Sequence, residues 1–446
     1  MGKIGLITDD MTGTMTCGVL LAQRGIKACS YFSEDNLEGA ENQDAVILST
    51  NSRNLPKDEA KASVKRAYRA LKAQGVEYFT KRIDTTFRGG IGYEVDALLE
   101  ELPEDTIAIV AAAMPDTRRI LVGGYSVIDG TILTETGAAK DVLFPIKMAH
   151  IPTILREQSG FPVAEIGMGA VLGSEDILAE AFTECKNHGA RLIVVDGITH
   201  AHLEKVANVL YQLKWNIVCV DPGAFTQKMA FLRGFGEADI VCKNQNKKID
   251  IKSLKEKVLI AAGSATDVTK NQIKILMKED YSSVIPVGAE NLIKGADSAK
   301  EEIEKVLETF QQTLLELGSN VIAFETASTG ARLDLKEMEQ KYNLMPGQAS
   351  GNINKGLGKI IYEAADCLYQ AGELAGIYMT GGDTLVSILR ALGAAGIRLV
   401  DTVQPQTNLG MIIGGKFEGV RIVGKGGLIG ADDTVVKVAE RLFREL

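Results

Sequence analysis

Short apolar runs alternate with helical patterns along the first third of the chain. Between these runs, residues 57–73 repeat apolar positions at helical spacing, and a first helical pattern ends at Arg24, with Gly25 placed to terminate it. The alternation predicts a mainly parallel sheet with helices on both faces. The predicted strands are KIGLIT (3–8), IKACSYF (26–32), DAVILST (44–50), EYFTKRI (77–83) and TIAIVAAA (106–113).

The segment YSVIDGTILTE (125–135) interrupts this rhythm. Asp129-Gly130 stands between two β-prone runs, which is typical of a two-residue hairpin turn. We therefore expect a β-hairpin flap beside the main sheet of the first domain. The α/β pattern resumes over 190–210 and 215–225.

A polar, lysine-rich segment, CKNQNKKIDIKSLKEKV (242–258), has no apolar period and marks a domain boundary. A second α/β unit starts after it and ends with a helical pattern from Leu357 to Leu368, a strand over 376–380 and another helix. The sequence thus predicts an α/β protein with domains over 1–242 and 258–446, each a mainly parallel sheet flanked by helices.

Length and composition agree with this organisation. A chain of 446 residues exceeds one ordinary core, and 46 glycines suit a protein with many close backbone turns. The net charge of −9 argues against a nucleic-acid partner. The six cysteines are scattered and form no C-x-x-C pair, which is typical of a reducing compartment. The sequence shows no secretory signal and no apolar run of membrane-spanning length. We therefore expect a soluble, cytoplasmic protein. A homo-oligomer is the default expectation.

Polar residues gather where the first predicted strands end. Asp9 and Asp10 follow the first strand, where open α/β sheets bind ligands. Two adjacent carboxylates suit a base for a hydroxyl, a magnesium contact or both, while the alternative is a simple helix cap by Asp10. We name Asp9 and Asp10 as candidate catalytic residues.

The block KRIDTTFRGGIG (81–92) follows another strand and mixes cations with hydroxyls. Its arginines and lysine suit a substrate carboxylate, and its threonines suit substrate hydroxyls; a solvated surface turn is the alternative. The segment STNSRN (49–54) adds an arginine at a comparable strand end. The candidate substrate-binding residues are Arg53, Lys81, Asp84, Thr86, Arg88 and Gly89.

Several glycine turns mark the second half of the chain. Glycines let the backbone approach an anion, and a helix N-terminus offers unpaired N–H groups. Lys425 supplies a cation, whereas 412–422 has a plain β-hairpin as its alternative. A nucleotide site is the best single explanation, with neither a P-loop nor a dinucleotide fingerprint present. Its candidate residues are Gly263, Ser264, Thr380, Gly381, Gly382, Asp383, Gly414, Lys425 and Gly427.

At these residues the chain resembles the four-carbon acid sugar kinase family over nearly its whole length. TDDMTGTMT (8–16), KRIDTTFRGGIG and PDTRRILVGGYSVIDGTILTET (115–136) are similar to the family's N-terminal motifs. GSATDVTKNQ (263–272), GGDT and GKGGLIG (424–430) are similar to its C-terminal ones. The resemblance implies an acid sugar such as threonate, erythronate or a 3-oxo-tetronate in the first domain, and ATP with Mg²⁺ in the second.

The chain departs from the family pattern at Thr16, Asp383 and Leu428, where the family carries Asp, Glu and Gly. Another hydroxy acid as substrate, or an acid-binding protein that does not consume ATP, therefore stays open. A hydroxy-acid dehydrogenase would also use two α/β domains. A kinase of the phosphofructokinase or NAD-kinase type shares the GGD turn but does not account for KRIDTTFRGG.

Overall fold

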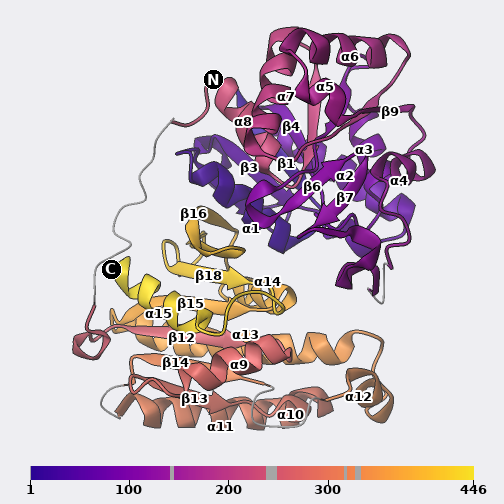
Figure 1. Ribbon diagram of the computed structural model, residues 1–446. Helices are drawn as coiled ribbons and strands as arrows, with labels where there is room; N and C mark the ends of the chain where they lie inside the picture. Colours follow the sequence, from indigo (N-terminus) through magenta and orange to yellow (C-terminus); the bar gives the residue numbers. More distant parts are fainter. Residues whose placement is uncertain (1, 141–144, 238–248, 316–318, 327–332) are drawn as a thin grey trace. The chain divides into compact units, whose positions relative to one another are not determined.

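The computed structural model describes residues 2–140, 145–237, 249–315, 319–326 and 333–446. The chain divides into two compact units, Met1–Ile240 and Val241–Leu446 (Figure 1). Each unit contains a mainly parallel sheet flanked by helices, which confirms the predicted fold class. Cys242 and the first residues of the predicted boundary segment lie outside the described residues.

The sheet of the first unit has eight parallel strands in the order β2-β3-β1-β4-β11-β5-β10-β9. The register places Thr8, the last residue of β1, beside Ser49 of β3 and Arg82 of β4. The carboxyl ends of these neighbours therefore meet at one edge. The strands are β1 Lys3–Thr8, β2 Ala28–Tyr31, β3 Ala45–Ser49, β4 Val76–Arg82, β5 Ile107–Val110, β9 Val163–Ile166, β10 Leu192–Val195 and β11 Ile217–Asp221.

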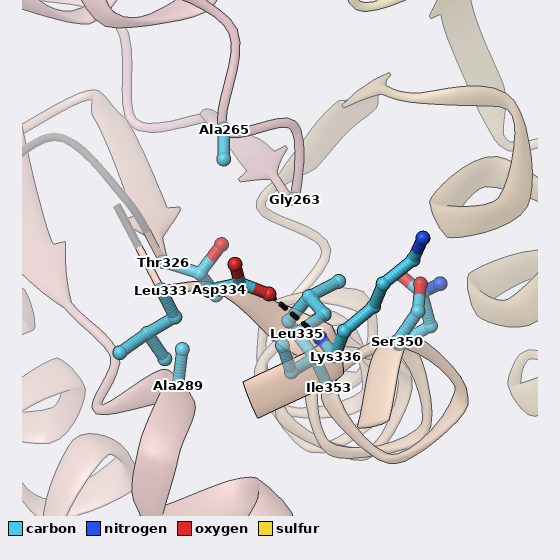
Figure 2. Close-up of a pocket in the computed structure, with 11 residues that line it drawn as sticks. Gly263, Ala265, Ala289, Thr326, Leu333, Asp334, Leu335, Lys336, Ser350 and Ile353 are labelled. Carbon is cyan, nitrogen blue, oxygen red and sulfur yellow. Dashed lines mark hydrogen bonds between the residues drawn. The ribbon is translucent and has the colours of Figure 1, made fainter. Parts of the chain in front are cut away.

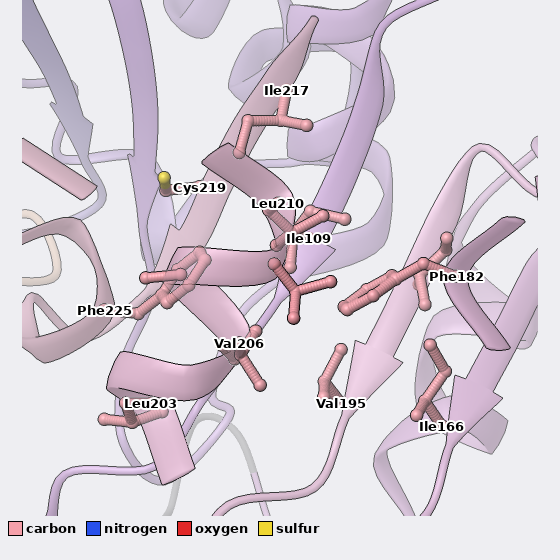
Figure 3. Packing of buried hydrophobic residues seen from close by; sticks show 14 of the residues in the cluster. Ile109, Ile166, Phe182, Val195, Leu203, Val206, Leu210, Ile217, Cys219 and Phe225 are labelled. Carbon is pink, nitrogen blue, oxygen red and sulfur yellow. The ribbon is translucent and has the colours of Figure 1, made fainter. Parts of the chain in front are cut away.

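Helices cover this sheet with apolar faces. In α7, Leu203, Val206 and Leu210 recur every three to four residues and pack with Ile109 and Cys219 of the sheet (Figure 3). Burying one such side chain contributes about 1.5–3 kcal/mol to the free energy of unfolding. The helices are α1 Met11–Ala22, α2 Lys57–Ala73, α3 Ile91–Leu99, α4 Ile151–Gln158, α5 Met168–Leu172, α6 Glu175–Asn187, α7 His200–Leu213 and α8 Ala224–Leu232.

A separate three-stranded antiparallel sheet forms the predicted flap. It consists of β6 Arg119–Val122, β7 Tyr125–Ile128 and β8 Thr131–Ile132. Asp129 and Gly130 link β7 to β8 with φ angles of 51° and 79°, as a two-residue hairpin turn requires. The hairpin is thus confirmed, and β6 extends it by a strand that the sequence pattern did not indicate.

The second unit has a seven-stranded sheet in the order β13-β14-β12-β15-β18-β17-β16. The neighbouring strands β13, β14, β12, β15 and β18 pair in parallel, and β17 is antiparallel to both of its neighbours, β18 and β16. Gly414 and Gly415, at φ 76° and 72°, begin the β17–β18 connection. The strands are β12 Lys257–Ala262, β13 Ser282–Pro286, β14 Val321–Glu325, β15 Leu374–Thr380, β16 Gly396–Gln404, β17 Thr407–Ile413 and β18 Arg421–Lys425.

The helices of the second unit also present apolar faces to its sheet. Leu442 of α15 packs in one core with Ile260 and Tyr378 of the strands, and α13 buries Leu357 and Ile361. No helix in the described part of the chain is both long and apolar enough to cross a membrane. The helices are α9 Asp267–Leu276, α10 Ala289–Lys294, α11 Ala296–Leu315, α12 Leu335–Lys341, α13 Gln348–Gln370, α14 Gly382–Ala391 and α15 Thr434–Arg444.

Each sheet contains one point where the chain connections diverge. In the first unit, β1 and β4 are neighbours, and their connections lead to β2 on one side and β5 on the other. In the second unit, β12 and β15 are related in the same way, with connections toward β13 and β16. Open α/β sheets bind ligands outside the carboxyl ends of strands at such points.

Candidate functional site

Asp9 and Asp10 lie at the carboxyl end of β1, at the divergence point of the first unit. Asp10 caps α1, because its Oδ1 accepts a hydrogen bond of 2.8 Å from the Gly13 amide. Capping does not bury the carboxylate, whose side chain stays 27% exposed, compared with 6% for Asp9. Asp10 is therefore the carboxylate of the pair that a ligand can reach.

Two arginines bridge these carboxylates. Arg53 bonds Asp9 through Nε at 2.7 Å and lies 2.9 Å from Asp10 through Nη1. Arg82 reaches Asp9 at 3.3 Å and Asp10 at 3.1 Å through its own Nη1. Gly13 makes this approach possible, since a Cβ there would overlap the Arg82 guanidinium. Arg82 is one of the block's cations that the sequence offered for a substrate carboxylate, but its pairing with Asp9 and Asp10 was not predicted, because nothing in the sequence distinguished it from Lys81.

The two arginines keep the buried Asp9 carboxylate ionised. Burial alone would raise the pKa of Asp9, but the nearby Arg53 and Arg82 guanidiniums outweigh it and hold that pKa below its usual value. Nη2 of Arg53 and Nε of Arg82 are buried with no hydrogen-bond partner among the described residues. Buried donors are almost always satisfied, so these two nitrogens suit an anionic ligand.

The loop after β4 forms a second part of this cluster. Arg88 Nε bonds Asp84 Oδ2 at 2.7 Å and Thr86 Oγ1 at 3.0 Å, and the Thr86 hydroxyl also donates to Asp84. Burial would raise the pKa of Asp84, but Arg53 and Arg88 lower it well below its usual range. Gly89, at φ 86°, lies against the Arg53 backbone. The structure thus brings these predicted residues together.

Lys81 lies differently from the expectation that it meets a substrate carboxylate. Its side chain is 1% exposed, and its Nζ is 2.8 Å from Glu94 Oε2, which is also buried. Side chains alternate along β4, so Lys81 and Arg82 face opposite sides of the sheet. Lys81 therefore forms its ion pair with Glu94 in the interior, and Arg82 is the β4 cation that forms ion pairs with Asp9 and Asp10.

The flap contributes another arginine that sequence reasoning missed. Arg119 begins β6, and its Nε is buried without a hydrogen-bond partner in the described part of the chain. Burial lowers the pKa of Arg119, although Asp84 is near enough to oppose this. The only signal in the sequence was its place in the block 115–136, where Arg118 beside it was indistinguishable.

In the second unit, glycine turns meet at the carboxyl ends of β12, β15 and β18. Thr266 Oγ1 donates to the Gly427 carbonyl at 2.6 Å, and the Gly381 amide donates to the Lys425 carbonyl at 2.9 Å. Gly381 needs its freedom, since its φ is 109°. Ser264 Oγ lies where a Cβ of Gly427 would be, so glycine allows these turns to close.

Lys425 is a buried cation at this edge. The residue is 4% exposed, and its Nζ donates to the carbonyls of Gly426 at 3.1 Å and Ile429 at 2.8 Å. No carboxylate forms an ion pair with it among the described residues. Burial lowers its pKa to about 8. An ammonium placed in this way is stabilised when an anion binds beside it.

A pocket of about 660 Å³ opens beside Gly263, within the volume range of small-molecule sites (Figure 2). Figure 2 shows Lys336 and Ser350 among the lining residues, and Asp334 accepts a 2.9 Å hydrogen bond from the Lys336 amide. No periodic pattern marked these residues, because they come from separate elements. The lining residues are Gly263, Ala265, Ala289, Thr326, Leu333, Asp334, Leu335, Lys336, Ser350, Ile353 and Asn354.

Gly414 does not join the other predicted nucleotide residues. It follows β17, which runs antiparallel to β18, so it lies beyond Arg421 at the opposite edge of the sheet from Lys425. Its amide donates to the Glu418 carboxylate within the hairpin connection. The hairpin alternative is therefore correct for 412–422, and Gly414 is removed from the candidate site. Gly382 and Asp383 begin α14 beside Gly381.

Comparisons with known proteins agree with this geometry. Residues 4–229 match a family model described as a sugar-binding N-terminal domain, and residues 259–435 match one described as a nucleotide-binding C-terminal domain. The chain is 32% identical to a D-erythronate kinase from Heliobacterium modesticaldum, over 100% of this chain and 98% of that protein. It is 26% identical to a D-threonate kinase from Salmonella typhimurium, over 97% and 96%.

A crystal structure of a protein from Salmonella typhimurium LT2 has a TM-score of 0.80 to this chain. It covers 98% of this chain and 99% of its own, at 20% identity, and so supports the fold alone. The two domain matches and the relative at 32% identity span the whole chain. The protein therefore belongs to the four-carbon acid sugar kinase family.

Proposed function

We propose that this protein transfers the γ-phosphoryl group of ATP to a hydroxyl of a small acid sugar of the erythronate, threonate or 3-oxo-tetronate type. The relatives named as D-erythronate and D-threonate kinases support this substrate class. In our proposal residues 1–242 bind the acid and residues 258–446 bind ATP, in keeping with the two domain descriptions.

The observation that carries the proposal is the state of Lys425. Its buried ammonium contacts carbonyl oxygens and no carboxylate of the described chain, and the turns at Gly381 and Gly427 lie beside it. An anion with several oxygens, such as a triphosphate, compensates this charge beside the start of α14, whose helix N-terminus favours an anion. The pocket beside Gly263 is a suitable volume for the base and ribose.

The acid's carboxylate is assigned to the arginines of the first unit. Arg53 and Arg82 each keep a buried donor nitrogen that no described residue satisfies, and Arg119 keeps a third. Guanidinium groups bind carboxylates with strong, directional hydrogen bonds. The Thr86–Asp84–Arg88 group then faces the hydroxyls of the acid. Lys81 supports β4 from within the core and does not contact the substrate in this proposal.

Asp10 is the residue proposed to meet the reacting hydroxyl, and Asp9 is proposed to position Arg53 and Arg82. The substrate oxygen forms a bond to the γ-phosphorus, the bond from that phosphorus to the β–γ bridging oxygen breaks, and ADP leaves. The hydroxyl proton passes to the Asp10 carboxylate. A strongly basic carboxylate is unnecessary, because the transition state of phosphoryl transfer is loose.

A magnesium ion fits the second unit better than the first. Asp9 and Asp10 are already neutralised by two guanidiniums, whereas Asp383 is exposed at the start of α14 beside the Gly381–Gly382 turn. Mg²⁺ binds through one or two carboxylates together with phosphate oxygens and water. Asp383 is therefore the residue that would hold it, and the ion would supply charge neutralisation of the phosphates.

The proposal is tested by measuring ADP formation from Mg-ATP across four- to six-carbon aldonic acids and their 3-oxo forms. We expect turnover with a four-carbon acid, and we expect Asp10→Asn to lose at least about a hundredfold in kcat, as for a lost proton acceptor. The same variant should keep wild-type ATP affinity. Absence of turnover with every acid, although the protein binds ATP, would refute the kinase assignment in favour of an acid-binding protein.

A further inference from the structure

One side-chain pair connects the pocket with the glycine turns of the second unit. The Thr384 hydroxyl donates a 2.8 Å hydrogen bond to Oδ1 of Asn354. Thr384 belongs to α14 and is 3% exposed, whereas Asn354 belongs to α13, is 8% exposed and lines the pocket. A polar pair this deeply buried holds both side chains in fixed orientations.

The backbone around this pair is shaped to bring it together. A Cβ on Gly263 would overlap the Thr384 hydroxyl, and a Cβ on Gly381 would touch it. Gly358, one helical turn after Asn354, lies against Ala391 and the Ser387 carbonyl of α14. Glycine at these three positions lets β12, α13 and α14 approach closely, so Asn354 and Thr384 meet beside the turns.

The bond settles which end of the Asn354 amide faces the pocket. Oδ1 is engaged by Thr384, while Nδ2 donates to no described residue and is not among the buried atoms that lack a partner. Asn354 therefore offers the pocket a hydrogen-bond donor. The other lining residues Ile353, Ala265 and Ala289 are apolar. A flat ring would therefore bind by van der Waals contact with them, and the Asn354 amide would supply the one hydrogen bond that distinguishes between rings.

We propose that Asn354 selects adenine over guanine by donating from Nδ2 to N1 of the base, and that Thr384 fixes the direction of that amide. This inference rests on the proposed use of ATP. Adenine N1 is an acceptor, whereas guanine carries a hydrogen on N1 and would place donor against donor. A site built around one oriented hydrogen bond rejects a ligand that leaves its polar group unpaired.

Three variants separate the parts of this inference. Asn354→Asp keeps the acceptor for Thr384 but replaces the donor with a second acceptor, which suits the N1–H and amino group of guanine. Thr384→Val keeps the shape and removes the hydroxyl that orients the amide. Thr384→Ser retains the hydroxyl and is the matched control.

The measurement is the binding of Mg-ATP, Mg-GTP and Mg-tripolyphosphate by calorimetry, with full-length proteins and no acid present. We expect the wild type to prefer ATP over GTP by roughly tenfold or more, as for one oriented hydrogen bond. Asn354→Asp should weaken ATP binding by about tenfold, shift the ratio toward GTP and leave tripolyphosphate binding unchanged. Thr384→Val should lower the ATP/GTP ratio several-fold, and Thr384→Ser should preserve it.

Two results would overturn the inference. One is an unchanged ATP/GTP ratio in Asn354→Asp; the other is an equal loss of ATP and tripolyphosphate binding, which would mean that Asn354 supports the turns and not the base. Neither result depends on the acid. A protein that binds nucleotides as expected but phosphorylates no acid would refute the proposed function alone, and acid turnover with an unchanged ratio would refute this inference alone.

Discussion

Lys425 carries a charge that its surroundings disfavour until an anion binds. Burial lowers its pKa to about 8 from an ordinary value of 10.5. Between these two values the unfolded chain binds a proton that the folded, ligand-free protein lacks, so the free energy of unfolding rises with pH across this window. Triphosphate binding favours the ammonium, so ATP affinity should fall as pH rises through about 8. Calorimetric titrations between pH 6.5 and 9.5 measure this dependence.

Replacing Lys425 with methionine is the control for this prediction. Lys425→Met removes the charge and keeps an unbranched apolar chain, so we expect ATP affinity to drop by at least about tenfold and lose its alkaline dependence. Without ATP at pH 7, the variant should melt no lower than the wild type, because a disfavoured charge has been removed. A large fall in melting temperature together with unchanged ATP binding would show that Lys425 is structural.

At the scale of single residues, the sequence predicted which residue types form the site better than it predicted the directions of their side chains. Asp9, Arg53, Asp84 and Arg88 cluster as expected, because strand ends supply them and a parallel sheet brings those ends together. Neighbouring residues on a strand face opposite sides of the sheet, so Arg82 faces Asp9 and Asp10 while the Lys81 side chain is buried against Glu94. A one-residue shift of this kind is invisible in a block where both positions carry cations.

At the scale of elements, the flap is anchored by one carboxylate. Asp196, which follows β10 and is 2% exposed, accepts bonds from the amides of Gly123 at 2.6 Å and Gly124 at 3.0 Å in the β6–β7 turn, and from Met168 at 3.0 Å. Leu121 of β6 also exchanges two backbone bonds of 2.9 Å with Gly197. These contacts fix the strand that begins with Arg119.

We predict that Asp196→Asn loosens the flap and raises the KM for the acid several-fold, while the KM for ATP stays at its wild-type value. The asparagine places an NH₂ group among three amide donors, and hydrogen bonds to a charged acceptor are worth about 1.5–3 kcal/mol each. Steady-state kinetics with both substrates varied give the two constants. Asp129→Asn is the matched control, because its ion pair with Arg118 lies exposed on the same flap. Equal effects of both variants would contradict the anchoring role.

At the scale of the whole molecule, the strand–helix alternation was sufficient to predict two α/β units. The change from the spacing of apolar residues in a strand to that in a helix can be recognised within a short stretch of sequence. Strand order was not accessible in this way, since β11 inserts between β4 and β5 through contacts distant in sequence. The divergence points at β1/β4 and β12/β15 follow from that order. The pocket beside Gly263 was missed for the same reason, because the segment after β12 and the helices α10, α12 and α13 each contribute only a few of its residues.

The two divergence points predict where each ligand protects the chain. A non-hydrolysable ATP analogue should slow amide hydrogen exchange in the segments after β12, β15 and β18, where we propose that the turns at Gly263, Gly381 and Gly427 surround the phosphates. Erythronate should slow exchange in the segments after β1 and β4, near Asp10 and Arg82. Hydrogen-exchange mass spectrometry with each ligand alone, and sodium sulfate at equal ionic strength as the control, measures both patterns. Protection of β1 and β4 by the nucleotide alone, with none after β15 and β18, would reverse the assignment of ligands to units.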